Sequence, residues 1–499
     1  MQAAMKLQSV SCAENAILCT KIQSCVPKQD LKGHSVAIIG LGKSGISATK
    51  LALARGASVL AIDENEKLVL TGQNIISKKH SILKTILGKF DHELLKEADV
   101  IVVSPGVPIE NYGLSALLQS GKRVMSELDF AAEVLPRGTK VLAVTGTNGK
   151  STVATFAGQM LRQLNIETFV GGNLGIPLSE AAFQCLTSSP QIFLQVAIVE
   201  VSSYQLEIPN KFFHPSVAVI LNLTPDHLER HKTMRNYAMT KCRVLSHMTG
   251  KKIAILPLGN PYLDEAIAGH VNECTFAWIG AYPGIKIDIE AKIANFEVPI
   301  IKHVSQLPLG AMKTIGTQNY YNAAVAALSV IGLDLGINDA AIYSTIGKLR
   351  APPHRMEIVH KDSHGISWVD DSKATNVEAT YAGLMGLKER KSVILLGGLA
   401  KVSDLQGSNG FEQLVEPLKY HRGVITFGSS GMMIQNTLSS NGLDIPCIRT
   451  RDLKNAVRLA KSMAKSGDTV VLSPGCASFD EFRNFEHRGK YFQELASSE

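Results

Sequence analysis

The chain has 499 residues, too many for one hydrophobic core, and a prior of about 150 residues per domain predicts three domains. Its composition, 45% hydrophobic and 19% charged, is typical of a soluble globular protein, and no apolar run reaches the roughly 18 residues that a membrane span needs. The net charge of +7 is spread along the chain, which suits small anionic ligands and argues against nucleic acid as a partner, because no concentrated basic arm is present.

The eight cysteines include no C-x-x-C pair and no spacing typical of a zinc site. We interpret them as reduced thiols in a reducing compartment, and we expect a cytoplasmic protein. Residues 1–31 lack a clear helical or strand period and are predicted to form an extension outside the core. This extension is mildly basic and has no arginine, so a disordered tail and a plastid or mitochondrial targeting remnant both remain open.

The first predicted domain opens with a strand, a glycine turn and a helix. Strand 35–39 runs into Gly40-Leu41-Gly42-Lys43-Ser44-Gly45, a helix covers 46–55, and strand 58–62 ends at Asp63. Taken alone, this is the fingerprint of an NAD-binding domain. A glycine turn at a helix N-terminus holds any diphosphate, however, so a nucleotide-diphosphate substrate is the competing interpretation. Its candidate ligands in this turn are Lys43 and Ser44.

A further strand, 99–103, runs into Ser104-Pro105-Gly106-Val107-Pro108. The prolines break any helix, so Ser104 is predicted on a loop at the carboxyl end of a parallel strand. Open α/β sheets bind their ligands at this edge.

The second predicted domain starts near residue 130 and contains a phosphate-binding loop between strand 141–144 and helix 153–164. Its glycines let backbone N–H groups turn towards phosphate oxygens, Lys150 supplies a point charge, and the Ser151 hydroxyl is placed to bind Mg²⁺. The usual first glycine is replaced by Val144, so the loop is a tighter variant. The predicted ATP-binding residues are Gly146, Thr147, Asn148, Gly149, Lys150, Ser151 and Thr152.

This loop, Thr-Gly-Thr-Asn-Gly-Lys-Ser-Thr, resembles the ATP loop of the Mur ligases, which are ATP-dependent amide-bond-forming enzymes of peptidoglycan synthesis. Folylpolyglutamate synthases share a related loop. The resemblance implies that the first domain binds a UDP-sugar, with Ser104 in a segment similar to that of the D-glutamate-adding members. It also implies that Asn173, in Gly171–Pro177, contacts the UDP-sugar; as bare sequence this segment equally fits a tight turn.

Two predicted strands end in residues suited to cations. The nearly continuous apolar run 192–201 contains one acid, Glu200, and a buried carboxylate beside a phosphate loop is costly unless it is paired or bound to metal. Residues 200–206 resemble the magnesium segment of the Mur ligases, which implies that Glu200 is a metal ligand. Strand 217–223 leads into a segment that matches the same family and gives His227 a role in binding metal or UDP-sugar.

Lys241 lies in a helix-like stretch, 236–243. The resemblance implies that this lysine is carbamylated by CO₂, which converts a cation into a carboxylate able to hold a second Mg²⁺. From the residues alone, a solvated lysine on a helix surface is the better interpretation. In a later predicted helix, ending at residue 331, the resemblance assigns adenine contact to Asn322.

Pro352-Pro353 marks a linker to the third predicted domain. Arg355 follows at once and is expected to reach the ATP phosphates when domains close. Strand 366–369 leads into Asp370–Asn376, where the resemblance assigns the ATP ribose to Asp371 and the incoming amino acid to Thr375, although helix capping alone accounts for Thr375. The same resemblance assigns D-glutamate binding to Lys401, Ser478 and Phe485, and residues 479–485 are predicted to be helical.

The expected fold is α/β with three domains of mostly parallel sheets: a Rossmann-like N-terminal domain (32–129), a P-loop ATPase-like central domain (130–350) and a Rossmann-like C-terminal domain (351–499). The resemblance implies a monomeric ligase that joins D-glutamate to UDP-MurNAc-L-Ala through an acyl phosphate. ATP and Mg²⁺ are its implied cofactors, and its implied catalytic residues are Lys150, His227, Lys241 and Arg355. Three alternatives stay open: a folylpolyglutamate-synthase-like ligase, an NAD-dependent oxidoreductase that rests on residues 40–63 alone, and a non-catalytic scaffold.

Overall fold

The computed structural model describes residues 29–68, 82–173, 175–189, 193–268, 274–300, 303–312, 314, 316–387, 391–400 and 409–498. Within these ranges the chain forms two compact units. The first holds the described residues up to Lys286, with 295–306 and 325–342; the second holds 287–294, 307–324 and the chain from Tyr343 onward. No helix in the described ranges is long and apolar enough to cross a membrane.

The first sheet has the order β3-β2-β1-β4-β5, and all its neighbouring strands are parallel. Alternate residues of the central strand face opposite sides: Val36 and Ile38 join the core that contains α2, while Ala37 and Ile39 join the core of α3 and α4. The bounds are β1 Ser35–Ile39, α2 Lys43–Ala54, β2 Ser58–Asp63, β3 Leu83–Leu87, α3 Leu94–Glu97, β4 Val100–Val103, α4 Leu114–Gln119, β5 Arg123–Ser126 and α5 Glu127–Ala132.

The N-terminal extension lies outside the described residues as far as residue 28. Leu31 is buried in the first core, although it was expected outside it, and Arg55 binds Asp30 through two hydrogen bonds of 3.0 and 2.7 Å. Residues 30 and 31 are therefore packed against the first sheet.

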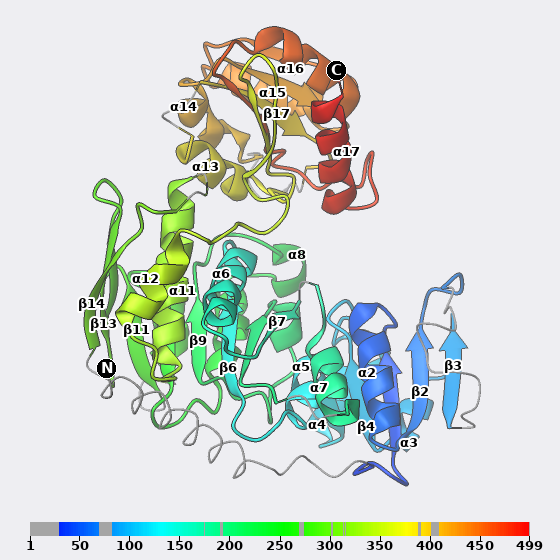
Figure 1. Ribbon diagram of the computed structural model, residues 1–499. Coiled ribbons are helices and arrows are strands. Elements are labelled where there is room, and N and C mark those ends of the chain that lie inside the picture. The colour runs from blue at the N-terminus through cyan, green and yellow to red at the C-terminus, as the bar shows by residue number, and fades with distance from the viewer. Residues whose placement is uncertain are drawn as a thin grey trace, which may run out of the picture. The chain divides into compact units, whose positions relative to one another are not determined.

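The second sheet has nine strands in the order β14-β13-β12-β11-β10-β9-β6-β8-β7. Its strands β6, β8 and β9 are parallel neighbours, so their carboxyl ends lie at one edge. Helix α7 contacts both α2 and α5, which joins the first two sheets within the first unit (Figure 1). The bounds are β6 Lys140–Thr145, α6 Lys150–Gln163, β7 Thr168–Gly172, α7 Leu178–Thr187, β8 Val196–Glu200, η2 Tyr204–Leu206, β9 Val217–Ile220, α8 Leu228–His231, α9 Met234–Cys242, β10 Ile253–Pro257, α10 Pro261–Ile267, β11 Thr275–Ile279, β12 Gly284–Asp288, β13 Ile293–Val298, β14 His303–Pro308, α11 Thr317–Gly332 and α12 Asp339–Ile346.

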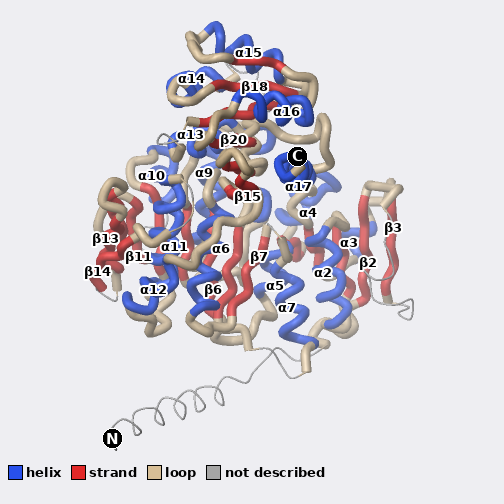
Figure 2. Tube along the Cα trace, turned by 45° about the horizontal axis from the view of Figure 1, so that its top comes forward, coloured by secondary structure: helices blue, strands red, loops and turns tan. Residues whose placement is uncertain are grey.

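The third sheet, in the second unit, has the order β15-β16-β20-β17-β18-β19, and only its edge strand β15 is antiparallel to its neighbour. Trp368 packs on the face covered by α16 and α17, which lie side by side in Figure 2, and Val369 packs on the face of α13, α14 and α15. The bounds are β15 Glu357–Lys361, β16 Ser367–Asp370, α13 Val377–Met385, β17 Ser392–Gly397, α14 Val415–Leu418, β18 Gly423–Phe427, α15 Gly431–Ser440, β19 Cys447–Arg449, α16 Leu453–Met463, β20 Thr469–Leu472 and α17 Phe485–Ser497.

One predicted helix begins later than expected. Residues 479–485 were predicted to be helical, but 479–484 form turns and bends and α17 begins at Phe485. The cause is Asn484, whose side chain accepts a hydrogen bond of 2.8 Å from the His487 N–H and so caps the helix at this point.

Candidate active site

The phosphate-binding loop connects β6 to α6, as its sequence predicts. Gly146 and Gly149 have φ angles of 138° and 86°, which favour glycine, and a Cβ on Gly146 would lie 3.1 Å from the Leu221 backbone nitrogen. Lys150 bends back over the loop and donates hydrogen bonds to the carbonyl oxygens of Gly146 (2.9 Å) and Thr147 (2.7 Å). Ser151 and Thr152 are buried in the first turn of α6.

Asn222, which the sequence did not single out as a site residue, holds this loop in shape. Its Oδ1 accepts hydrogen bonds from the N–H groups of Thr147 (3.0 Å) and Asn148 (2.8 Å), and its Nδ2 donates to the Asn148 carbonyl (3.0 Å). The signal available in the sequence was its position just after the apolar strand β9, at the carboxyl edge where β6 also ends.

Lys241 lies beneath the loop instead of on a solvated helix surface. Its side chain is 1% exposed, its Nζ donates to the Gly146 carbonyl (3.0 Å), and it lies 4.5 Å from the Tyr237 ring centroid. Burial, followed by the charge of Lys150, holds the pKa of Lys241 well below its usual value. The neutral form of this amine is therefore favoured more than in a solvated lysine.

Two further candidates lie at the same edge of the second sheet. Glu200 ends β8 and is buried, and Asn173 contacts it through a backbone N–H donated to its carbonyl (2.8 Å) and an Nδ2 that lies 3.4 Å from its Oε1. His227 precedes α8 in a left-handed conformation, with φ of 55°, and its Nδ1 lies 2.7 Å from the Tyr204 hydroxyl. The phosphate loop, Glu200 and His227 thus stand at the carboxyl ends of β6, β8 and β9, which lie at one edge of the sheet.

In the first sheet, Ser104 and Asp63 both support the glycine turn. The Ser104 hydroxyl donates to the Gly40 carbonyl (2.7 Å), and the Asp63 carboxylate accepts from the Leu41 N–H (2.6 Å). Asp63 therefore orders the turn itself. Lys43, which is exposed, and Ser44, which is half-buried, stand in the first turn of α2.

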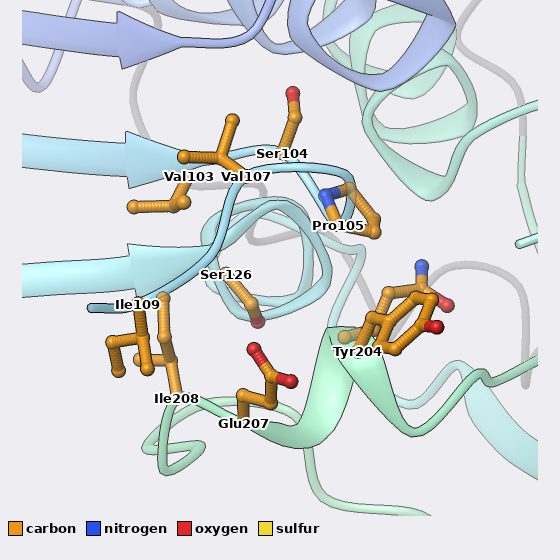
Figure 3. Close-up of a pocket in the computed structure, with 10 residues that line it drawn as sticks. Val103, Ser104, Pro105, Val107, Ile109, Ser126, Tyr204, Glu207 and Ile208 are labelled. Atoms are coloured by element: carbon orange, nitrogen blue, oxygen red, sulfur yellow. The ribbon is translucent and has the colours of Figure 1, made fainter. Parts of the chain in front are cut away.

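A small pocket lies between the loop after β4 and the segment after β8 (Figure 3). Ser104, Pro105 and Val107 line it from the first sheet's side, and Tyr204 and Glu207 line it from the side of the second sheet. The loop that carries Ser104 thus faces the segment that follows Glu200.

In the second unit, Asp371 is fully buried at the end of β16. It accepts hydrogen bonds from the Ser473 hydroxyl (2.7 Å) and the Met356 N–H (3.2 Å), yet burial raises the pKa of this carboxyl to about 7. Arg355 lies close enough for its charge to oppose this rise. Asn322 is buried on α11.

The residues assigned to the amino acid lie on loops after adjacent strands of the third sheet. Thr375 follows β16, Ser478 follows β20 and is buried, and Phe485 begins α17 with its ring 5.3 Å from the Lys373 Nζ. Lys401 lies outside the described residues.

Arg488, a second residue that the sequence did not single out, joins two of these loops. It is 0% exposed and donates hydrogen bonds to the carbonyl oxygens of Ser372 (2.8 Å), Cys476 (3.0 Å) and Ala477 (3.2 Å). Burial, the largest cause, lowers the pKa of this guanidinium to about 10. Arginine is rarely buried, and the sequence alone does not indicate that this one holds two loops together through their carbonyl oxygens.

Three family profiles match this chain in succession. The profile of the "Mur ligase MurD-like, N-terminal domain" matches residues 34–126, that of the "Mur ligase middle domain" matches 144–330, and that of the "Mur ligase, glutamate ligase domain" matches 354–476. Together they cover most of the chain and place one domain on each of the three sheets. The chain belongs to the Mur ligase family.

Its similar curated relatives carry one name, UDP-N-acetylmuramoylalanine--D-glutamate ligase. The relative from Desulfatibacillum aliphaticivorans is 34% identical over 93% of this chain and 98% of its own length. That from Anaeromyxobacter dehalogenans is 33% identical over 94% of this chain and 99% of its own length.

Solved structures share the fold at lower identity. The MurF ligase of Thermotoga maritima, solved in complex with ADP, is 17% identical with a TM-score of 0.58, covering 94% of this chain and 96% of its own. The folylpolyglutamate synthase of Mycobacterium tuberculosis, complexed with ADP, is 14% identical with a TM-score of 0.51 and covers 77% of this chain and 94% of its own. These structures share the predicted α/β fold, and the three family profiles give the three Mur ligase domains.

Proposed function

We propose that this protein is an ATP-dependent ligase that forms an amide bond between D-glutamate and the L-alanyl carboxyl group of UDP-MurNAc-L-Ala. The observation that carries the proposal is similarity over almost the full length to relatives named UDP-N-acetylmuramoylalanine--D-glutamate ligase. The phosphate loop, which Lys150, Lys241 and Asn222 contact, supports it. The folylpolyglutamate-type alternative is weaker, because its neighbours cover 77% of the chain.

ATP fits the loop after β6. Backbone N–H groups in a glycine turn at the N-terminus of α6, with the Lys150 cation beside them, form a phosphate-binding arrangement. At Gly146 the positive φ angle and a close approach of Leu221 (3.1 Å to an added Cβ) both disfavour any larger residue. We further assign Asn322 to adenine, Asp371 to the ribose and Arg355 to the phosphates of ATP.

Mg²⁺ fits the donor set at the carboxyl edge of the second sheet. Ser151 offers a hydroxyl oxygen, Glu200 a buried carboxylate and His227 an imidazole, and oxygen-rich sets of this kind suit Mg²⁺. When bound, the ion neutralises phosphate charge and polarises the transferring phosphoryl group.

Lys241 completes this set after carbamylation. Its uncharged Nζ attacks the carbon of CO₂, an N–C bond forms, and a proton leaves the nitrogen for water, so a buried amine becomes a carbamate anion. The depressed pKa of Lys241 supports this step, because only the neutral amine has a free electron pair. The carbamate then provides oxygen ligands beside Glu200.

The reaction itself needs activation, because a carboxylate is a poor acyl donor. The alanyl carboxylate attacks the γ-phosphorus of ATP, which gives an acyl phosphate and releases ADP. The amine of D-glutamate then attacks the acyl carbon, and the tetrahedral intermediate expels phosphate. Lys150 and Arg355 stabilise the charge on the transferring group, and the folds position the reactants.

Substrate positions follow from the loops. We assign the UDP-sugar to Lys43, Ser44, Ser104, Asn173 and His227, which all belong to the first unit. We assign D-glutamate to Thr375, Lys401, Ser478 and Phe485 in the second unit, of which Lys401 is assigned from the resemblance alone.

The test is a phosphate-release assay with purified protein, ATP and Mg²⁺. UDP-MurNAc-L-Ala is offered with a panel of D- and L-amino acids, and tetrahydrofolate with L-glutamate forms a separate arm. Release that requires both UDP-MurNAc-L-Ala and D-glutamate is expected. Release only with the folate arm, or with none of these pairs in a folded protein, contradicts the proposal.

A further inference from the structure

Tyr204 makes a direct contact with the imidazole of His227. Tyr204 opens η2, just after β8, and its hydroxyl lies 2.7 Å from His227 Nδ1, closer than Asp226 Oδ2 lies to Nε2 (3.4 Å) or Glu229 Oε1 to Nδ1 (3.5 Å). The two rings are tilted, with centroids 4.9 Å apart. Because His227 belongs to the proposed metal and substrate site, the group that holds its ring also determines which nitrogen faces that site.

The second partner of the Tyr204 hydroxyl gives the contact a direction. This hydroxyl donates to Glu229 Oε1 at 3.3 Å, so its oxygen is left to accept a hydrogen bond from the Nδ1–H group of His227. Glu229 Oε1 also lies 3.5 Å from Nδ1. On the other side of the ring, Nε2 lies 3.4 Å from Asp226 Oδ2. Nδ1 therefore faces two oxygen acceptors on the Tyr204 side, and Nε2 faces the Asp226 side.

Two further side chains pack against the Tyr204 ring. The Arg230 guanidinium lies 5.2 Å from its centroid, and the His231 ring is stacked on it at 5.8 Å and 22°. Arg230 donates to Glu207 Oε1 (2.8 Å) and to the Val107 carbonyl (3.2 Å). Val107 lies on the same loop as Ser104, which faces Tyr204 across the pocket in Figure 3. Arg230 therefore links the Tyr204 ring to this loop.

We propose that Tyr204 is a positioning residue for His227: its hydroxyl, relayed to Glu229, holds the imidazole as the Nδ1–H tautomer and directs Nε2 towards the divalent cation. The inference rests on the proposed function for the identity of that cation. A tyrosine that only packs between Arg230 and His231 needs its ring but not its hydroxyl. The hydroxyl is therefore the group to test.

Tyr204→Phe removes this oxygen and keeps the ring. Mn²⁺ serves as the probe for the cation and is titrated into the purified full chain by electron paramagnetic resonance. Removal of a group that orients a metal-bound histidine typically weakens metal binding 10- to 100-fold, so a loss of about tenfold is expected. Tyr262→Phe, at an exposed tyrosine on α10, is the matched control and should bind Mn²⁺ as the wild type does.

The tautomer is read in metal-free protein by ¹⁵N NMR of histidine-labelled chain, with His227→Gln used to assign the signal. The wild type should show protonated Nδ1, and Glu229→Ala should shift the proton to Nε2, because the Tyr204 hydroxyl is then able to donate to Nδ1. Glu229→Gln keeps an oxygen acceptor and should resemble the wild type. Glu229 is exposed, so these variants are expected to fold.

An unchanged tautomer in both Tyr204→Phe and Glu229→Ala, together with unchanged Mn²⁺ affinity, overturns the inference. The tautomer readout needs neither ATP nor substrate. A protein that lacks ligase activity but shows the expected tautomer shift therefore contradicts the proposed function and not the role of Tyr204.

Discussion

Lys150 and Lys241 donate hydrogen bonds to the same carbonyl oxygen, that of Gly146, at 2.9 and 3.0 Å. Two ammonium groups this close repel each other, and the buried one is more easily neutralised. The charge of Lys150 is thus a cause, second to burial, of the lowered pKa of Lys241.

Lys241→Ala should abolish activity, and a short carboxylic acid such as acetate should restore part of it. The acid enters the space that the side chain leaves and supplies the oxygen ligands of the missing carbamate. Phosphate release is measured against acetate concentration, with Lys251→Ala, an exposed lysine, as the control. Full activity without any response to acetate would return Lys241 to a structural role.

Lys150→Ala should reduce ATP turnover by about 10²- to 10³-fold or more, because it removes a preorganised positive charge from the transferring phosphoryl group. The fold should persist, since the Lys150 Nζ donates hydrogen bonds to carbonyl oxygens of the loop that carries it. Turnover and circular dichroism are compared with the wild type. Near-normal turnover in this variant would contradict the assignment of this loop to the ATP phosphates.

Lys401→Ala should raise the KM for D-glutamate far more than the KM for ATP. A compact cation suits one carboxylate of a dicarboxylic amino acid, and its loss removes ground-state binding at one subsite. Both KM values are measured by phosphate release. Equal effects on the two substrates, or equal activity with L-glutamate, argue against this assignment.

The buried pair of His354 and Asp370 makes the stability of the second unit depend on pH. The imidazole Nδ1 lies 2.7 Å from Asp370 Oδ2, and this hydrogen bond raises the pKa of His354 against the opposing effect of burial. A histidine whose pKa is higher in the folded state than in the unfolded state, where it is about 6.5, stabilises the folded protein. This contribution to the free energy of unfolding is complete below the unfolded pKa and is lost as the pH rises through the folded pKa.

We therefore expect the free energy of unfolding of the second unit to fall as the pH rises from 6 to 9. His354→Gln should lower it by about 3 kcal/mol at pH 6 and flatten the pH dependence. In a Trp278→Phe background the remaining tryptophan, Trp368, lies in β16 and reports on the second unit alone. A wild-type curve as flat as that of the variant contradicts this prediction.

Asp371→Asn should stabilise the ligand-free protein above pH 7 and weaken ATP binding. Because burial raises the pKa of Asp371 to about 7, its contribution to stability falls as the pH rises from about 4 to 7 and stays low above that. Removing the charge should therefore raise the free energy of unfolding by on the order of 2 kcal/mol at pH 8. Urea unfolding at pH 5 and 8 and the KM for ATP test both parts. A variant that is less stable at pH 8 would contradict the first part.

Much of the architecture could be predicted from the sequence, because most of the buried strands are short apolar runs followed by a recognisable motif. The buried parallel strands β1, β4, β6 and β9 are short apolar runs, and each is followed at its carboxyl end by glycine, proline or polar residues. Because parallel strands end at one edge, their motifs were expected to meet there. Glu200, at the end of β8, and His227, in the segment after β9, lie at the same edge of the second sheet, on either side of β6.

Other features depend on packing that no local pattern records. A lysine in a polar helix normally faces solvent, yet Lys241 is buried because the loop after β6 lies over it. The contacts of Tyr204 with His227, of Asn222 with the loop and of Arg488 with Ser372 join residues 23 or more positions apart. Polarity alone would have placed Arg488 at the surface.

The order of strands in the third sheet also governs when this part of the chain is able to fold during its synthesis. The last strand to be made, β20, lies between β16 and β17, and Arg488 closes the loops from a position still closer to the end. The first sheet, by contrast, is complete once β5 has been made. A growing chain therefore carries the apolar strands β16 and β17 without their central neighbour until β20 has been made, and exposed strand edges of this kind favour aggregation.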